Sequence, residues 1–162
     1  MDTSGPIKKW SQLQNIKVRV PSAGKTVGTV EDFYYKSEST GVDALLVRTR
    51  LGDAYTLPII KIHQISSDEV IIDSEQMLAR RPSPYPLGSS LIGSKVQDEK
   101  GNDIGTIGEI FLNVEPVAAT RVAGFELNGN GRSQGKTFSS DAIMHYENNL
   151  FTLQDQFVRK LK

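Results

Sequence analysis

The sequence contains no cysteine, only two histidines and a single tryptophan among its 162 residues. Without cysteine the chain can form no disulfide, no thiolate zinc site and no cysteine nucleophile. Its 19 basic and 19 acidic residues balance, whereas a broad nucleic-acid surface needs an excess of positive charge. We therefore expect no nucleic-acid partner, and a chain suited to a reducing cytoplasm.

Long apolar runs are absent as well. No stretch approaches the ~18 apolar residues needed to cross a bilayer, and residues 1–12 do not contain the apolar segment of a signal peptide. Hydrophobic residues nevertheless make up 38% of the chain and charged residues 23%, a balance typical of a packed core. These features predict a cytoplasmic protein without a transmembrane segment, which would reach a membrane complex only by peripheral docking.

The sequence repeats itself, at an offset of 78 residues in the first matched segment, 77 in the second and 81 in the later ones. The matched segments are 11–18 with 89–96, 24–33 with 101–110, 56–59 with 137–140, and 70–72 with 151–153. The extra residues of the second copy are predicted to lie in its longer loop 128–135, where the first copy turns through 51–53. Because loops tolerate insertion and strands do not, this pattern indicates that one folding unit occurs twice.

Each copy is predicted to be β. Residues 16–20 and 27–33 alternate apolar and polar side chains, and residues 44–60 contain two strand-like runs around a Gly-Asp turn. Short strands between glycine and aspartate turns favour a small barrel, because such sheets must hide their edges. Capping and helical spacing at 73–79 and 154–162 predict short helical turns. The expected fold is all-β, with two tandem small β-barrels, each followed by a short helical turn.

The domain boundaries follow from these elements. We expect an N-terminal extension at residues 1–10, a first barrel at 11–79, a connector at 80–88 and a second barrel at 89–162. Three prolines between positions 82 and 86 favour extended polyproline geometry. The connector is therefore expected to be semi-rigid.

The repeated motif resembles that of a known family. In the second copy the matching segments are Ser90-Leu91-Ile92-Gly93, Lys95-Val96, Gly101, Ile104-Gly105-Thr106-Ile107 and Glu109-Ile110. Their order resembles the PRC-barrel family, which includes the cytoplasmic domain of the photosynthetic reaction-centre H subunit and the C-terminal domain of a ribosome-maturation factor. The first copy departs from the motif at Asn15, where glycine is usual, and at 21–23, where an acidic turn is usual. Both departures affect turns more than the core pattern.

The resemblance implies a non-enzymatic role, in which the barrels dock onto partner proteins and assist the assembly or function of a larger complex. By analogy with the H subunit, that complex belongs to the photosynthetic apparatus. An RNA- or ribosome-associated role is the alternative, although the balanced charge argues against it. A small-ligand or metal-binding barrel is the third alternative, and exposed edge strands would allow a homodimer. We expect no cofactor.

Two short segments imitate a phosphate-binding loop. Residues 23–26 and 134–137 both contain Gly-Lys-Thr. Arg19 and Asn130 stand where such a loop needs an earlier glycine, and both segments lead into strand-like sequence rather than a helix. Both are therefore predicted to be turns.

Other polar groups also lack the arrangement of a reaction centre. The acidic stretch 98–103 does not have the residue order of a calcium loop and is predicted to be a solvated hairpin turn. His63 and His145 have no neighbouring ligands in the sequence that would complete a zinc site, and are expected at exposed or half-buried strand positions. No serine lies in a Gly-x-Ser-x-Gly elbow. The sequence therefore predicts no enzyme.

Three aromatic residues near the first barrel are candidates for partner binding. Trp10 follows two lysines, and is expected either to anchor an interface or to pack over a barrel end. Tyr34 and Tyr35 follow Phe33 in one strand. Because side chains alternate between the faces of a strand and Phe33 is expected in the core, Tyr34 or Tyr35 should lie outside.

The connector supplies three further candidates. Arg80, Arg81 and Tyr85 would together grip an acidic partner; as an alternative, they form a solvated linker. The connector and the groove between the barrels are thus where a partner is expected.

Overall fold

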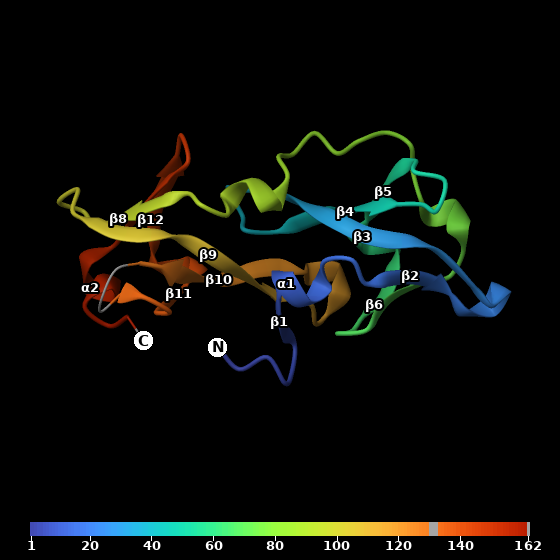
Figure 1. Cartoon of the computed structure of the whole chain (residues 1–162), viewed down its shortest axis with the longest axis horizontal. Helices are drawn as coiled ribbons and strands as arrows, with labels where there is room; N and C mark the ends of the chain where they lie inside the picture. The colour runs from blue at the N-terminus through green and yellow to red at the C-terminus, as the bar shows by residue number, and fades with distance from the viewer. Residues whose placement is uncertain (130–132, 162) are drawn as a thin grey trace.

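A computed structural model gives the structure of the protein and describes residues 1–129 and 133–161. The chain is almost entirely β and forms two curled sheets that lie side by side along the long axis of the molecule (Figure 1). This confirms the predicted all-β class, with two tandem small barrels and a short helical turn after each. We refer to strands β2–β7 as the first repeat and to strands β8–β13 as the second repeat.

The first repeat is a six-stranded sheet with the order β5-β4-β3-β2-β7-β6. Its strands and 3-10 turns are β2 (Lys17–Val20), η1 (Pro21–Ala23), β3 (Lys25–Tyr35), β4 (Val42–Arg48), β5 (Ala54–Pro58), η2 (Ile59–Lys61), β6 (Ile62–Ile65), β7 (Glu69–Ile72) and η3 (Glu75–Met77). Neighbouring strands are antiparallel except β2 and β7, which are parallel. In β2 the buried Val18 and Val20 alternate with more exposed cations, as the sequence pattern predicts.

The second repeat has the equivalent order β11-β10-β9-β8-β13-β12, and β1 pairs with β9 as an additional strand. Its elements are η4 (Gly88–Leu91), β8 (Lys95–Gln97), β9 (Asp103–Asn113), η5 (Val117–Ala119), β10 (Arg121–Asn128), β11 (Thr137–Ser139), η7 (Ser140–Ala142), β12 (Ile143–Glu147), β13 (Leu150–Leu153) and α2 (Asp155–Val158). The chain begins with β1 (Ile7–Lys9) and α1 (Trp10–Leu13). Part of the predicted N-terminal extension is therefore a strand of the second sheet.

The two sheets share irregularities as well as strand order. β2 and β3 have a bulge after the pair Val18–Gly28, and β8 and β9 have one after the pair Val96–Gly105. Two bulges between β3 and β4 recur between β9 and β10, and one between β6 and β7 recurs between β12 and β13. A bulge is a local feature that strand periodicity does not require. The matching bulges therefore identify the sheets as two copies of one unit.

The additional residues of the second repeat lie mainly before β10. The pairing register makes Leu112 the counterpart of Tyr35, and Val122 the counterpart of Val42. Residues 36–41 separate the first pair of positions, whereas the longer segment 113–121 separates the second. The prediction that placed the insertion in loop 128–135 is therefore wrong for all but one residue. Loop 128–135 has the glycine-rich sequence expected of an insertion. The inserted residues instead lie in segment 113–121, whose apolar side chains pack.

The segments that precede the repeats are exchanged across the junction. α1, before the first repeat, packs against β9, and its counterpart η4, before the second repeat, packs against β3. Lys9 of β1 pairs with Phe111, and Leu87 of the connector forms the equivalent bridge with Tyr34. Equivalent contacts in both directions are the signature of an approximate twofold relation. Each sheet is thus completed by the segment that leads into the other repeat.

Backbone hydrogen bonds follow the same relation. Val42 donates its N–H to the Thr120 carbonyl at 2.9 Å, and Val122 donates to the Thr40 carbonyl at 2.7 Å. An isolated antiparallel bridge joins positions 41 and 121 between them. The approximate axis therefore passes close to this bridge.

Carboxylates at equivalent bulges complete the junction. The Ser11 N–H donates to Glu109 Oε1 at 3.2 Å, and the Ser89 N–H donates to Asp32 Oδ1 at 3.0 Å. The Ser89 hydroxyl also donates to Asp32, whose side chain is buried. A buried carboxylate needs such donors, since burying it unpaired is strongly unfavourable. Asp32 therefore ties the start of the second repeat to β3.

The buried side chains form one cluster that runs through both repeats. At the junction the ring of Trp10 meets the ring of Phe33 edge-on, with centroids 4.9 Å apart and an interplanar angle of 65°. Within the second repeat Phe125 lies 5.2 Å from Phe151 and 5.4 Å from Phe138. Aromatic side chains bury large apolar areas, so this cluster is the main source of stability.

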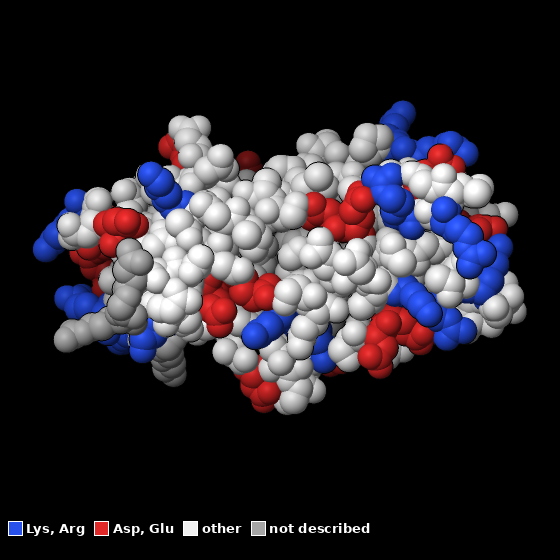
Figure 2. All heavy atoms as spheres, viewed as in Figure 1, with Lys and Arg blue, Asp and Glu red and all other residues white. Residues whose placement is uncertain are grey.

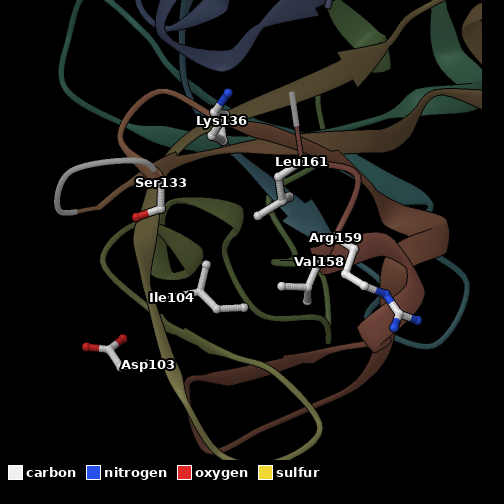
Figure 3. Close-up of a pocket in the computed structure, with 7 residues that line it drawn as sticks. All are labelled: Asp103, Ile104, Ser133, Lys136, Val158, Arg159 and Leu161. Atoms are coloured by element: carbon white, nitrogen blue, oxygen red, sulfur yellow. The ribbon is translucent and has the colours of Figure 1, made fainter.

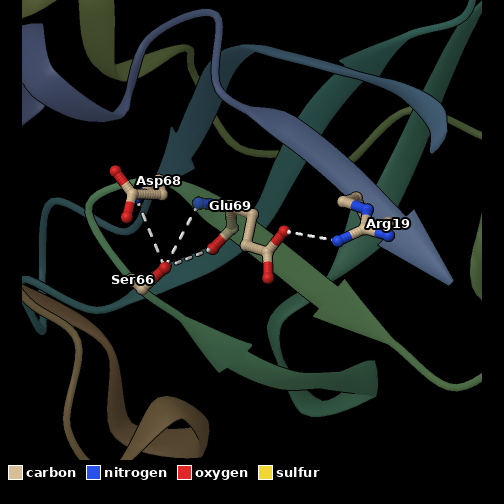
Figure 4. Close-up of polar contacts among 4 residues, drawn as sticks. All are labelled: Arg19, Ser66, Asp68 and Glu69. Carbon is tan, nitrogen blue, oxygen red and sulfur yellow. Dashed lines mark hydrogen bonds and ion pairs between the residues drawn. The ribbon is translucent and has the colours of Figure 1, made fainter. Parts of the chain in front are cut away.

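An ion pair joins the parallel strands of the first repeat. Arg19 Nη1 on β2 lies 3.1 Å from Glu69 Oε2 on β7 (Figure 4). Glu69 follows a turn in which the Ser66 hydroxyl accepts the N–H groups of Asp68 and Glu69 at 3.3 and 3.2 Å. Because both charged side chains are partly exposed, such a pair contributes at most ~1 kcal/mol. The strand pairing depends mainly on the buried apolar residues beneath it.

Candidate functional site: the connector and the surface clefts

The three aromatic candidates near the first repeat are buried. Trp10, Tyr34 and Tyr35 expose 4%, 7% and 2% of their surface. The prediction that Tyr34 or Tyr35 lies outside is therefore wrong. The side chains do alternate along β3, but the connector covers this strand end beside Tyr34 and the second repeat covers Tyr35. For Trp10, packing at the junction is the alternative that the structure supports.

The connector candidates lie at the surface. Arg80, Arg81 and Tyr85 are exposed, and Tyr85 exposes 40% of its surface. The Arg80 guanidinium lies over the Tyr55 ring, 5.4 Å from its centroid, and the Lys36 ammonium lies 5.4 Å from the centroid of Tyr85. Cation–ring contacts at exposed sites contribute about 0.5–1 kcal/mol each. They orient two of the three candidate side chains.

Hydrogen bonds fix the connector along its length. Ala79 exchanges two backbone hydrogen bonds with β5, of 2.7 and 2.8 Å. The Ser83 hydroxyl donates to Asp43 Oδ2 at 2.8 Å, and the Pro86 carbonyl accepts the Tyr35 N–H at 2.9 Å. Figure 1 shows the connector running along one side of the first repeat before it reaches η4. The connector is thus an ordered ridge held by the first repeat.

A hollow of about 660 Å³ lies beside α2 in the second repeat. The described residues that line it are Asp103, Ile104, Ser133, Lys136, Val158, Arg159 and Leu161. Figure 3 shows Ile104, Val158 and Leu161 directed toward its centre, whereas the charged ends of Asp103 and Arg159 point away. The interior of the hollow is therefore apolar and its charges lie at the rim.

A second cleft, of about 360 Å³, lies between the repeats at the end of β3. One wall comes from the loop joining β3 to β4 and the other from β12, whose hairpin with β13 projects from the second repeat (Figure 1). The lining residues are Tyr35, Ser37, Glu38, Thr40, Ser140, Ile143, Met144, His145 and Tyr146. Tyr146 is held by stacking on Phe151, with centroids 4.3 Å apart, and its hydroxyl donates to Asn149 Oδ1 at 3.1 Å. We call this space the junction cleft.

Burial, together with the neighbouring Tyr146, raises the pKa of Tyr35 to about 12. An unfolded chain releases this proton near pH 10, so between pH 10 and 12 the folded state binds more protons than the unfolded state. The contribution of Tyr35 to the free energy of unfolding is fully present below pH 10. It falls by about 2–3 kcal/mol as the pH rises to 12.

Urea unfolding between pH 9 and 12 measures this loss. We expect the Tyr35→Phe variant to lose less stability over that range than the wild-type protein does. Tyr85→Phe, at an exposed position, serves as the matched control. Identical pH profiles for wild type and Tyr35→Phe would contradict the assignment.

The segments that imitate phosphate loops are turns, as predicted. Gly24 ends η1 with φ at 62°, and Lys25 begins β3. Gly135 precedes β11 with φ at 77°. These positive φ angles favour glycine, which has no Cβ to clash. Asn130, which stands where a phosphate loop would need a glycine, lies outside the described residues.

The remaining polar motifs also have structural roles. Asp98 closes the predicted hairpin turn. The hydrogen bond from the Asn102 side chain lowers the pKa of Asp98 most, and the one from the Asn102 backbone lowers it further. His63 and His145 are exposed strand residues at or beside equivalent bulges. Within the described residues, no three His, Cys, Asp or Glu side chains form a group that could hold a metal ion.

Comparison with known proteins leaves the family open. No protein-family model matches the chain, and no curated protein is detectably similar to it. Among the described residues, no helix combines the length and apolarity needed to span a bilayer.

Proposed function

We propose that the chain is a non-enzymatic, protein-binding adaptor of the PRC-barrel type, which assists the assembly or function of a larger complex. The observation that carries this proposal is the ordered connector, whose residues Arg80–Pro86 we call the connector ridge. A segment that is already held in shape loses little conformational entropy on binding. Extended proline-rich segments are also a common form for recognition by aromatic-lined grooves.

The side chains of the connector ridge indicate the chemistry of the partner. Arg80 and Arg81 present guanidinium groups, which pair with carboxylates through two parallel hydrogen bonds. Tyr85 is exposed farther along the same ridge, and arginine and tyrosine are enriched among residues that dominate binding energy. We therefore propose a partner surface with acidic residues beside an apolar groove.

The larger complex is proposed from the family resemblance. By analogy with the reaction-centre H subunit, the adaptor would act in the cytoplasm and dock peripherally on a membrane complex, such as the photosynthetic apparatus. Its partner is a protein in this proposal, since the formal charge of the chain is balanced and the face drawn in Figure 2 carries both basic and acidic side chains.

Affinity capture from lysate of the native host, followed by mass spectrometry, tests the proposal. The ridge variant Arg80→Glu/Arg81→Glu/Tyr85→Ala should reduce recovery of the specific partner at least tenfold. Charge reversal opposite acidic residues turns attraction into repulsion, and loss of an aromatic anchor alone weakens binding by ~2 kcal/mol.

A matched control carries the same kinds of change on the second repeat. Lys100→Glu/Lys160→Glu/Ile92→Ala alters two exposed cations and one exposed apolar residue away from the ridge. It should recover the partner as the wild type does. Equal recovery by wild type, ridge variant and control, or no reproducible partner with any of them, would refute the proposed role of the ridge.

A further inference from the structure

The approximate symmetry of the junction fails at one place. On the first repeat, η5 packs against η2 and β6. The equivalent elements of the second repeat are η7 and β12, and they face the short loop 36–41 instead. The junction cleft lies there, where no counterpart of η5 is present within the described chain. The first repeat is thus covered and the second is open.

Equivalent residues line both places. The pairing register makes Leu112 the counterpart of Tyr35 and Ile65 the counterpart of Tyr146. Reciprocal hydrogen bonds match Thr120 with Thr40, and Val114 and Ser37 lie two residues beyond Leu112 and Tyr35. The first member of each pair borders a residual space of only about 10 Å³, whereas the second borders the junction cleft of about 360 Å³. The longer segment 113–121 contributes Val114 and Thr120 to the filled space, whereas the shorter segment 36–41 borders the open cleft through Ser37, Glu38 and Thr40.

The open site contains a polar group without a hydrogen-bond partner among the described residues, the hydroxyl of Tyr35. Tyr35 is 98% buried, since it exposes only 2% of its surface, and it lines the junction cleft. Among the described residues its hydroxyl has no hydrogen-bond partner. Its oxygen is accessible from the cleft, so a ligand carbonyl that enters the cleft can accept a hydrogen bond from it. Ile143 and the exposed Met144 add apolar surface beside it.

We infer that the junction cleft binds a short peptide segment of the partner protein, with small aliphatic side chains after a proline. The chain itself shows what fits, because residues 114–120, with the sequence Val-Glu-Pro-Val-Ala-Ala-Thr, cover the equivalent surface of the first repeat. The inference rests on the proposed adaptor function. It also places the two surfaces together, since Lys36 lies over Tyr85 of the connector ridge while Ser37 lines the cleft.

A peptide titration of the full-length, isotopically labelled protein tests the inference. The probe is an acetylated and amidated octapeptide that copies residues 113–120, Asn-Val-Glu-Pro-Val-Ala-Ala-Thr. We expect saturable chemical-shift changes at Thr40, Met144 and Tyr146. A peptide with aspartate in place of the copied Val117 should cause no such changes, because the charge would be desolvated against apolar side chains.

Two variants of the protein make the titration specific. Tyr35→Phe removes the free hydroxyl and should weaken peptide binding about fivefold, the effect of one hydrogen bond. Met144→Ala removes apolar contact and should weaken it by a similar factor. His63→Ala is the matched control, because His63 is the counterpart of Met144 on the covered repeat. It should bind the peptide as the wild type does.

Shift changes scattered over the surface, no saturation, or equal affinity for all three variants would overturn the inference. The ridge variant keeps the junction cleft and should bind the peptide normally. If partner capture fails but the peptide binds in the cleft, the adaptor proposal falls and the site stands. If capture depends on the ridge but the peptide does not bind, the site falls and the adaptor proposal stands.

Discussion

Replacing Trp10 with alanine should lower the free energy of unfolding by about 3–5 kcal/mol. Trp10 exposes only 4% of its surface and meets Phe33 edge-on at the junction. Its helix α1 packs against β9 of the other repeat. The substitution therefore removes a large buried ring at the point where the repeats meet, and the neighbouring backbones cannot close the space.

Urea denaturation followed by far-ultraviolet circular dichroism measures this effect, since Trp10 is the only tryptophan fluorophore. Trp10→Phe should lose much less, because a smaller ring still fills most of the space. Ile92→Ala, at a residue that exposes 41% of its surface, should change the free energy of unfolding by ~0.5 kcal/mol or less. A loss below ~1 kcal/mol for Trp10→Ala would contradict the packing role assigned to the ring.

Replacing Gly88 with alanine should destabilise the protein by about 2–3 kcal/mol. A Cβ at this position would lie 2.0 Å from Cζ of Phe33 and 2.2 and 2.4 Å from the adjoining ring atoms. Phe33 is fully buried and so has no free space into which to move. Gly88 begins η4 and Trp10 begins the equivalent helix α1. The largest side chain thus stands on one side of the junction and the smallest residue at the equivalent position on the other.

A double-mutant cycle separates this clash from a general effect of glycine replacement. Phe33→Leu makes room, so Gly88→Ala should be less destabilising in the Phe33→Leu background than in the wild type. Gly5→Ala is the control, because a Cβ there would meet nothing within 4 Å. Thermal or urea unfolding of the set suffices. Strict additivity of the two substitutions would show that Gly88 does not owe its importance to the Phe33 ring.

The sequence predicts strands such as β2 and β7 well because their buried residues alternate with more exposed ones. The duplication also follows from sequence, since Gly28-Thr29-Val30 and Gly105-Thr106-Ile107 occupy equivalent positions in register. What it does not predict is how the copies share edges. The pairing of residues 7–9 with β9 depends on a sheet formed from residues about a hundred positions later, and no local propensity carries that information.

The candidate site was only partly predictable for the same reason. Arg80, Arg81 and Tyr85 are exposed as expected, since charge and proline content are local properties. Tyr34 is buried beside the connector and Tyr35 beside the second repeat, and alternation along one strand cannot indicate this. One feature of the sequence indicates the junction cleft, namely the difference in length between segments 36–41 and 113–121.

The junction cleft exists only if the two repeats form one cooperative body, held together by equivalent contacts. Native-state hydrogen exchange at increasing denaturant tests this directly, through the most protected amides of each repeat and those of Val42 and Val122 at the junction. The structure predicts that all of them exchange through one common opening, with the same free energy and the same denaturant dependence. Two sets of amides that open separately, one in each repeat, would contradict it.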